Sequence, residues 1–359
     1  MLRRQKLAFG VVLGVILIIA LWGLYPASTP PIKDDRGNKV PQSIATLEKI
    51  QIGGMDQWIL IRGRDTANPV LLWLHGGPGA AQIPIARHYN GILEDDFIVV
   101  HWDQRGAGKS NPRDFDEQSM AFEQFISDTH ELTQYLKERF NREQIFLVGH
   151  SWGSQLGIKV VQAYPEDYHA FVGVSQTVDS ARGSSIAYAW LREQFEESGN
   201  TRELQRLEEL GLPPYTDHQM YVKFAQMIIS AGGGLDVDVG RLAVIALRAP
   251  EYRAADYVSW LQGSTRGSGA MWEETREFNM FRDVPQIMVP IYFFSGVLDY
   301  NTPFKLVKEY YAYLDAPYGK QLVRFEESAH APFMAEAEKF NQELVKVKEE
   351  IIGNAKQNE

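Results

Sequence analysis

The pentapeptide Gly149-His-Ser-Trp-Gly153 places Ser151 between two glycines. The apolar run IFLV precedes this pentapeptide, and a segment with helical spacing, WGSQLGIKVVQAY, includes its last residues and continues beyond it. A serine on a tight turn between a strand and a helix has its hydroxyl lifted above the sheet, and flanking glycines leave room for the turn. Because a serine hydroxyl alone is a poor nucleophile, the pattern indicates nucleophilic catalysis only if a base and an orienting acid accompany it.

His330 is the candidate base, because it lies in the loop EESAHAPF directly after the last predicted strand. Asp299 ends an earlier predicted strand in FFSGVLDYNTP and is the candidate acid. Ser151, Asp299 and His330 follow one another in the chain order of one known type of serine triad. Asp103 also ends a predicted strand, but it precedes the serine and breaks this order. We expect His330 to accept the proton of Ser151 and Asp299 to hold the imidazole in the required tautomer.

Backbone N–H groups close to Ser151 are expected to form an oxyanion hole, the donor pair that stabilises negative charge on the reacting oxygen. Trp152 supplies one N–H at the start of the predicted helix. The motif HGGPG at 75–79 ends a predicted strand and supplies the second donor, from Gly77 or alternatively from Gly76. Pro78 has no N–H to donate.

The elements that must position these groups alternate between strands and helices. Strands are predicted at 43–54, 57–64, 69–77, 96–103, 144–150, 170–176, 289–299 and 320–328. Helices are predicted at 118–140, 151–165, 302–314 and 333–352. Strands and helices that alternate in this way predict an α/β fold, with a mostly parallel, doubly wound sheet covered on both faces.

Residues 178–285 interrupt the alternation, because they contain helical patterns and no convincing strand. The simplest interpretation is a helical cap inserted over the carboxyl ends of the strands, where sheets of this kind bind ligands. A separate helical domain with no role at the site is the alternative. The resulting division is 43–177 with 286–353 as the core, 178–285 as the cap and 354–359 as a tail.

The N-terminus predicts a membrane anchor. Residues 1–6 are basic, residues 7–25 carry no charge, and 26–42 are rich in proline and polar residues, as in a linker. A stretch of 19 uncharged residues is close to the length needed to span a bilayer and longer than a signal-peptide core. Basic residues stay on the cytoplasmic side, so the catalytic part would be extracytoplasmic. A cleaved signal peptide with secretion, and a buried soluble helix, are the alternatives.

Composition limits the classes of chemistry. The chain has 359 residues, a net charge of −10 and no cysteine. Disulfides, zinc–thiolate sites and a cysteine nucleophile are therefore excluded, and the acidic balance argues against a nucleic-acid partner. The GAGKS segment at 106–110 resembles the end of a phosphate-binding loop, but Asp103 stands where that motif needs glycine. The predicted reaction requires no metal and no organic cofactor.

Five motifs in order, HGGPG, WDQRGAGKS, GHSWGSQLG, SGVLDYNTP and SAHAPF, resemble the α/β-hydrolase superfamily, specifically its prolyl-iminopeptidase-like branch. The resemblance covers about 42–352 and implies an α/β-hydrolase fold with a helical cap and an acyl-enzyme mechanism. It implies Ser151, Asp299 and His330 as the triad, with Gly77 and Trp152 as the oxyanion hole. A serine at 151 argues against the epoxide-hydrolase and haloalkane-dehalogenase branches of the superfamily, which use an aspartate at that position.

The resemblance implies that cap glutamates hold the free amino group of a substrate. The glutamates considered for this role are Glu251, Glu273, Glu274 and Glu277. An aminopeptidase acting on short peptides is the first hypothesis, and a carboxylesterase or amidase acting on small hydrophobic substrates is the second. A non-catalytic ligand-binding hydrolase fold is the third, and the intact triad argues against it. The sequence leaves the oligomeric state open.

Overall fold

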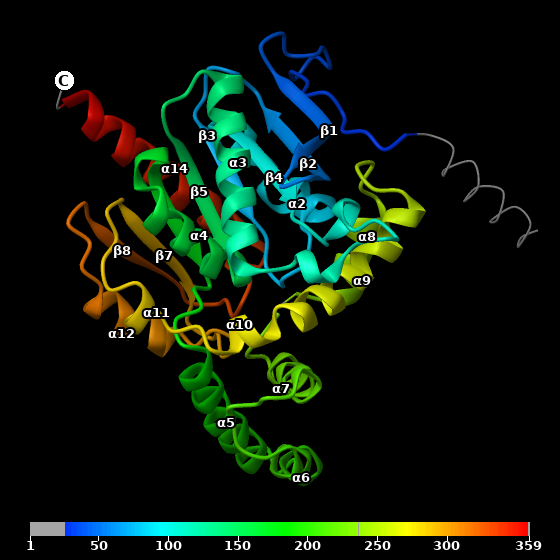
Figure 1. The fold of residues 1–359 in the computed structure, drawn as a ribbon, viewed down its shortest axis with the longest axis vertical. Helices are drawn as coiled ribbons and strands as arrows, with labels where there is room; N and C mark the ends of the chain where they lie inside the picture. Colours follow the sequence, from blue (N-terminus) through cyan, green and yellow to red (C-terminus); the bar gives the residue numbers. More distant parts are fainter. Residues whose placement is uncertain (1–25, 236, 358–359) are drawn as a thin grey trace, which may run out of the picture.

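The computed structural model describes residues 26–235 and 237–357, and its centre is an eight-stranded sheet with helices on both faces (Figure 1). The strand order is β1-β2-β4-β3-β5-β6-β7-β8. β2 runs antiparallel to both β1 and β4, and all other neighbours are parallel. The strands are β1 (Ile44–Ile52), β2 (Met55–Gly63), β3 (Val70–Leu74), β4 (Ile98–Asp103), β5 (Ile145–His150), β6 (Tyr168–Val174), β7 (Ile291–Gly296) and β8 (Lys320–Phe325).

The central strands are uninterrupted apolar runs because both of their faces are buried. Every residue of β3 and of β5 is buried. Successive side chains point to opposite faces, so Leu72 and Leu147 join one hydrophobic cluster while Leu71 and Phe146 join the other. The parallel core therefore has two hydrophobic layers, one on each side of the sheet.

Helices cover both layers. α3 (Phe122–Phe140), α4 (Trp152–Ala163) and α12 (Phe304–Tyr313) contribute to the first cluster, and α2 (Ile83–Asn90) and α14 (Ala337–Gln357) contribute to the second. α13 (Pro332–Ala335) precedes α14. The sequence analysis did not predict α2, which has only eight residues and carries a proline in its first turn. Its burial comes from tertiary contacts that a local pattern does not reveal.

A buried ion pair fixes the loop after β4 to α3. Arg105 donates from Nε and Nη2 to the two carboxylate oxygens of Asp128, at 2.9 and 3.0 Å. Gln57 and Gln124 donate to the same carboxylate at 2.9 and 2.7 Å. Arg105 also reaches the carbonyl of Gly53, so this network joins the β1–β2 turn, the β4 loop and α3. Asp128 is fully buried, and these donors compensate for its lost hydration.

The segment between β6 and β7 contains the cap helices, which lie beyond one end of the sheet (Figure 1). They are α5 (Ser180–Glu197), α6 (Thr201–Leu210), α7 (His218–Ser230), α8 (Val239–Leu247), α9 (Ala254–Ala270), α10 (Trp272–Arg276) and α11 (Met280–Asp283). α5, α6 and α7 share a small hydrophobic cluster of their own. α8 and α9 instead contribute side chains to the second layer of the main core.

Glycines let α9 lie directly on the loops of the core. A Cβ on Gly263 would stand 2.8 Å from the carbonyl oxygen of Gly106, and one on Gly267 would stand 2.6 Å from that of Pro78. A Cβ on Gly79 would stand 2.1 Å from the carbonyl oxygen of Gly263. The cap and the HGGPG loop are therefore in backbone contact.

The segment 26–42, interpreted from its composition as a linker, lies against the body. Ile32 and Val40 are buried, and the backbone N–H of Val40 donates to the carbonyl of Ile32 at 3.0 Å. Within the ranges 26–235 and 237–357, no helix has the length and hydropathy to cross a bilayer. The anchor predicted at 7–25 lies outside these described residues.

Replacing Asp128 by alanine should lower the free energy of unfolding by about 3–5 kcal/mol, because it leaves the Arg105 guanidinium buried without its partner. Asp56→Ala removes the exposed ion pair with Lys49 and serves as the control, with an expected loss below about 1 kcal/mol. Urea unfolding followed by tryptophan fluorescence measures both. Equal midpoints for the two variants would contradict the role given to Asp128.

Candidate active site

Ser151 occupies a strained turn between β5 and α4. Its φ of 54° and ψ of −117° lie outside the regions that serine normally adopts. A Cβ at Gly149 would come 2.2 Å from the carbonyl oxygen of Gly153, and one at Gly153 would come 2.2 Å from that of Leu74. The Ser151 N–H donates to the carbonyl of Val174 on the neighbouring strand at 3.0 Å. The two glycines and the adjacent strands thus fix the position of the serine.

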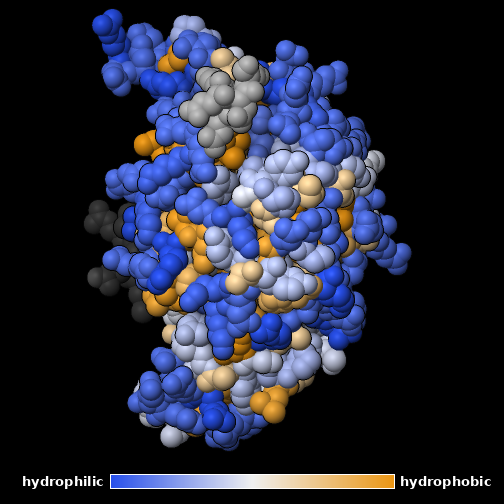
Figure 2. Space-filling model, turned by 90° about the vertical axis from the view of Figure 1, so that its left-hand side faces the viewer, coloured by the Kyte–Doolittle hydropathy of each residue, from blue (hydrophilic) through white to orange (hydrophobic). Residues whose placement is uncertain are grey.

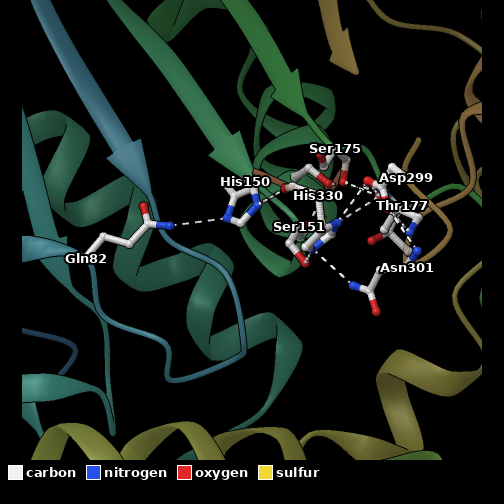
Figure 3. A network of polar contacts seen from close by, with 10 residues as sticks. Gln82, His150, Ser151, Ser175, Thr177, Asp299, Asn301 and His330 are labelled. Carbon is white, nitrogen blue, oxygen red and sulfur yellow. Dashed lines mark hydrogen bonds and ion pairs between the residues drawn. The ribbon is translucent and has the colours of Figure 1, made fainter. Parts of the chain in front are cut away.

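The structure brings Ser151, His330 and Asp299 together (Figure 3). His330 Nε2 lies 2.9 Å from Ser151 Oγ, and His330 Nδ1 lies 2.9 Å from Asp299 Oδ2. The other oxygen of Asp299 accepts the backbone N–H groups of Asn301 and Thr302 at 2.8 Å each, and Thr302 Oγ1 donates to Oδ2 at 2.7 Å. The aspartate is therefore aligned by three donors and can accept a hydrogen bond from Nδ1–H, which leaves the Nε2 lone pair to accept from the serine.

The Asn301 side chain is a second neighbour of the same imidazole nitrogen. Its Nδ2 lies 3.0 Å from His330 Nε2, and the residue lines the same cavity as Ser151 (Figure 3). The amide can donate to Nε2 when that nitrogen is unprotonated. Asn301 therefore stands where the leaving group of a bound substrate would meet the histidine.

The N–H groups of Gly77 and Trp152 are available as an oxyanion hole. Both residues line the cavity beside Ser151, and no hydrogen bond among the described residues uses either N–H. Gly77 has a φ of 117°, which favours glycine, and a Cβ there would come 2.5 Å from the nitrogen of Gly79. Gly76, the alternative donor, packs against the serine, since a Cβ on it would lie 3.2 Å from Ser151 Cβ.

Gln104 connects the HGGPG loop to α4. Its backbone N–H donates to His75 Nε2 at 3.2 Å, and its side-chain amide donates to the carbonyl of His75 at 3.2 Å. The Trp152 indole donates to Gln104 Oε1 at 3.1 Å. One buried glutamine therefore sets the spacing between the two predicted oxyanion donors, although its sequence context gave no sign of this role.

His150, next to the serine, holds the loop of His330. Its Nε2 donates to the carbonyl oxygen of His330 at 2.9 Å, and its Nδ1 accepts from Gln82 at 3.2 Å (Figure 3). The Trp73 indole fixes the orientation of the Gln82 amide by donating to its oxygen at 2.7 Å. Burial, together with nearby His330, lowers the pKa of His150 to about 3, so the ring stays neutral and keeps this tautomer.

Two cap glycines hold the loops that carry Asp299 and His330. The Gly233 carbonyl accepts the N–H groups of Tyr300 at 2.8 Å and Asn301 at 3.2 Å, and the Gly234 carbonyl accepts that of His330 at 3.0 Å. Above them the Trp190 ring of α5 stacks on Tyr300, with centroids 4.1 Å apart and planes 7° from parallel. The cap therefore contributes directly to the position of both residues.

The cavity at Ser151 lies between the core and the cap and has a volume of about 100 Å³. Its cap side combines apolar side chains, including Tyr221, Phe224, Ile228 and Trp272, with polar ones, including Ser184, Ser268 and Arg276. Asp179 is the acidic residue among the lining side chains of the described chain. Its Oδ1 accepts the N–H of Arg182 at the start of α5, and its Oδ2 accepts from Asn279 at 2.9 Å. Each oxygen keeps a lone pair for a further donor.

The glutamates predicted for substrate binding lie elsewhere. Glu251 is buried against Arg87 and Thr29, and Glu274 accepts the N–H of Phe122 at 2.9 Å. Glu273 is exposed and pairs with Arg276, as Glu277 also does. None of them lines the cavity. Glu251 instead forms its ion pair with Arg87 of α2, and Glu273, Glu274 and Glu277 lie on the exposed surface of α10 and of the turn after it. The structure therefore does not bring these residues to Ser151.

Asp103, the rival acid, is part of a separate buried network. It accepts the Tyr252 hydroxyl and the backbone N–H of Lys109, and burial raises its pKa to about 7. Lys109 pairs with Asp256 of α9 at 2.8 Å, so its ammonium group is already occupied in the segment that resembles a phosphate loop. The motif DQRGAGKS thus connects β4 to the cap.

Comparisons with known proteins show which family this chain resembles. The family described as "Serine aminopeptidase, S33" matches residues 68–207. The probable aminopeptidase YbaC of Bacillus subtilis (strain 168) is 38% identical over 303 residues, which are 83% of this chain and 95% of that protein.

Solved structures show the same fold. A proline iminopeptidase from Mycobacterium smegmatis has a TM-score of 0.59 at 17% identity, covering 86% of this chain and 99% of its own. A proline iminopeptidase-related protein from Thermus thermophilus has a TM-score of 0.58 at 18% identity, with 85% and 97% covered.

Gly233→Ala should lower kcat by on the order of 10- to 100-fold, because the displaced loop would move Asp299 and His330 away from Ser151. The added methyl would lie 2.6 Å from the Trp190 ring and 3.0 Å from Tyr300 Cβ. Gly91→Ala is the matched control, since its Cβ meets nothing within 4 Å and its φ is −60°. Steady-state kinetics on a soluble substrate, with circular dichroism to check folding, measure the effect. Equal kcat values for the two variants would contradict the inference.

Unfolding should become easier as the pH falls from about 6.5 towards 4. Burial lowers the pKa of His75 to about 4 and of His101 and His150 to about 3. In this pH range the three imidazoles are therefore protonated in the unfolded chain but neutral in the native state. Asp103 acts in the opposite sense, which leaves a net uptake of about two protons and a slope of about 2–3 kcal/mol per pH unit. Urea midpoints at pH 7 and pH 5 measure this slope.

His101→Gln should reduce the slope, and His88→Gln, at an exposed position, should leave it unchanged. A stability that is constant or rises on acidification would contradict the assignment of these histidines as neutral.

Proposed function

The chain belongs to the serine aminopeptidase family S33 and is an α/β-hydrolase enzyme, and from this we propose that it removes N-terminal residues from short peptides by a serine mechanism. The observation that carries the proposal is the hydrogen-bonded chain from Ser151 through His330 to Asp299 at the wall of a cavity. The same cavity offers a carboxylate, Asp179, to a substrate amino group.

In the proposed reaction, Ser151 Oγ attacks the carbonyl carbon of the first peptide bond while His330 Nε2 accepts the serine proton. Asp299 stabilises the resulting imidazolium through Nδ1–H. The N–H groups of Gly77 and Trp152 donate to the oxygen on which negative charge develops. His330 then gives its proton to the departing amine, which leaves the N-terminal residue as an ester on Ser151. Water, deprotonated by the same histidine, hydrolyses this ester.

Asp179 is the residue that we assign to the substrate's ammonium group. A charge-assisted hydrogen bond from an ammonium to a carboxylate contributes about 1.5–3 kcal/mol. The carboxylate is mostly buried and is oriented by Asn279 and by the first turn of α5, so it is preorganised for a donor. An acidic group at a fixed place in the cavity would select substrates with a free amino group and limit how far they extend beyond it.

The apolar side chains on the cap side of the cavity support a second candidate, a carboxylesterase or amidase acting on small hydrophobic substrates. The side chains of Phe224, Ile228 and Trp272 can contact an acyl chain, but none of them can accept a hydrogen bond from an ammonium group. The one polar atom among them, the Trp272 indole N–H, already donates to the carbonyl of Thr216. Such a substrate would use the same serine, histidine and aspartate but would not need Asp179.

We further propose that residues 7–25 anchor the enzyme in a membrane as a single-pass helix, with the catalytic domain on the extracytoplasmic side. The proposal is supported by the 19 uncharged residues and by the basic residues before them. Secretion after cleavage of a signal peptide is the alternative.

The enzyme should hydrolyse an aminoacyl anilide with a free amino group, and it should turn over the N-acetylated form of that anilide only slowly. The variant Ser151→Ala should show little turnover of either substrate. Asp179→Asn should lower kcat/KM for the free amine by about 10- to 100-fold, which corresponds to the loss of one charge-assisted hydrogen bond. Activity on a short acyl ester should change little in that variant, because the ester lacks the ammonium.

Asp217→Asn is the matched control, because Asp217 caps α7 as Asp179 caps α5 but does not line the cavity. Equal kcat/KM on the free and acetylated anilides would favour the esterase or amidase. Undiminished turnover by Ser151→Ala would refute the serine mechanism.

A further inference from the structure

Helices α8 and α9 expose an unusual number of large apolar side chains. Scattered single apolar residues are normal on a protein surface, but a cluster marks an interaction site. Five of the twelve exposed large hydrophobic residues among the described residues lie on these two consecutive helices. They are Val239, Val244, Leu247, Val258 and Leu261, which are between 47% and 66% exposed and which we call the α8–α9 face.

α8 carries an excess of apolar surface for its position. Its sequence is VGRLAVIAL, in which only Ala246 is fully buried. A helix that is apolar all round is normally covered on all sides, either by a protein core or by lipid. Leu242 and Ile245 pack partly on the core, which leaves Val244 and Leu247 without cover from the described chain.

The opposite side of the molecule differs. In Figure 2, which shows the side carrying β8, hydrophobic residues form separate patches among hydrophilic ones. Exposed apolar residues near β7 and β8 include Leu298 after β7, Tyr313 at the end of α12 and Tyr318 before β8.

The charge around the α8–α9 face is positive in a chain whose net charge is −10. Residues 238–256 contain Arg241, Arg248 and Arg253 together with three acidic residues, Asp238, Glu251 and Asp256. Glu251 is paired with Arg87 and Asp256 with Lys109, which leaves Asp238, the N-cap of α8, as the one acidic residue of this segment without a cationic side-chain partner among the described residues. Apolar side chains beside arginines are the combination that binds at the interface of a membrane with anionic lipids.

The described chain begins at this face. Ser28 donates its N–H to the carbonyl of Pro250 at 3.1 Å, and Thr29 Oγ1 donates to Glu251 at 2.8 Å. Arg253 donates to the carbonyl of Pro26 at 2.5 Å. Residue 26 is therefore held at the loop between α8 and α9. In the sequence, the uncharged segment 7–25 ends directly before it, so no residue lies between that segment and Pro26.

We propose that the α8–α9 face docks on the surface of a lipid bilayer, with Val244, Leu247, Val258 and Leu261 at the level of the headgroups and Arg241 and Arg248 on anionic lipids. An anchor that ends at residue 25 requires a bilayer surface within a few residues of Pro26, which is where this face lies. Residues 7–25 folded over the face, or a second copy of the chain, would also cover it, and the test distinguishes these occupants.

The absence of cysteine from the chain makes single-site labelling direct. The full chain carrying Leu247→Cys is labelled with an environment-sensitive fluorophore and reconstituted in vesicles of equimolar phosphatidylcholine and phosphatidylglycerol. Lipids with a nitroxide near the headgroup should quench this label at least about twofold, because interfacial docking buries it about 5–10 Å into the headgroup region. Tyr318→Cys is the control, since its exposed position before β8 should show little quenching.

A second variant tests the apolar contact itself. Val244→Glu in the same full chain should reduce the quenching of a label at Leu261→Cys, whereas Tyr318→Glu should not. Hydrolysis of a soluble substrate is measured for each variant, so that loss of docking is separated from loss of folding or of the catalytic activity.

Three outcomes would overturn the proposal. The first is a chain that sediments with vesicles but whose label at residue 247 is not quenched by the lipid nitroxides. The second is a label that is shielded from water without lipid quenching, which would assign the face to residues 7–25 or, with a doubled mass, to a second copy. The third is a full chain that does not associate with the vesicles at all.

Discussion

The backbone of Ser151 is the constraint on which the site depends. Its φ and ψ of 54° and −117° hold the hydroxyl above the end of β5, a conformation that costs about 1–3 kcal/mol and persists only when the surroundings enforce it. Gly149 and Gly153 make the turn sterically possible, and the ladder from β3 through β5 to β6 fixes its position. Tight packing of the central strands thus serves the site as well as the core.

The loops around this turn are fixed by separate buried contacts. Gln104 holds the HGGPG loop against α4, and His150 holds the backbone of His330. Gly233 and Gly234 reach in from the cap to the loops of Asp299 and His330. Because the cap supplies part of this support, its helices do more than cover the cavity. A movement of the α7–α8 connection would change the position of Asp299 and His330 as well as access to Ser151.

The sequence predicted the parts of the site that local patterns encode. The alternation of strands and helices identified the fold, and the spacing of Ser151, Asp299 and His330 identified three side chains that the structure brings within hydrogen-bonding distance. It could not identify Gln82, Gln104 or Gly233, because their partners lie far along the chain and no local pattern marks them. The cap glutamates were selected because the family resemblance implies that cap glutamates bind the amino group, but no motif identified which ones. The cavity instead contains Asp179, whose position depends on how α5 enters the cap.

The central claim is that Ser151 is the nucleophile of a covalent mechanism, and labelling with a fluorophosphonate tests it most directly. This reagent phosphonylates a serine, with fluoride as the leaving group, only where an adjacent base activates that serine. The account predicts one adduct per chain, located by peptide mass spectrometry at Ser151, with activity lost in proportion to labelling. Complete inactivation with Ser151 unmodified, or a modified Ser151 with activity retained, would contradict it.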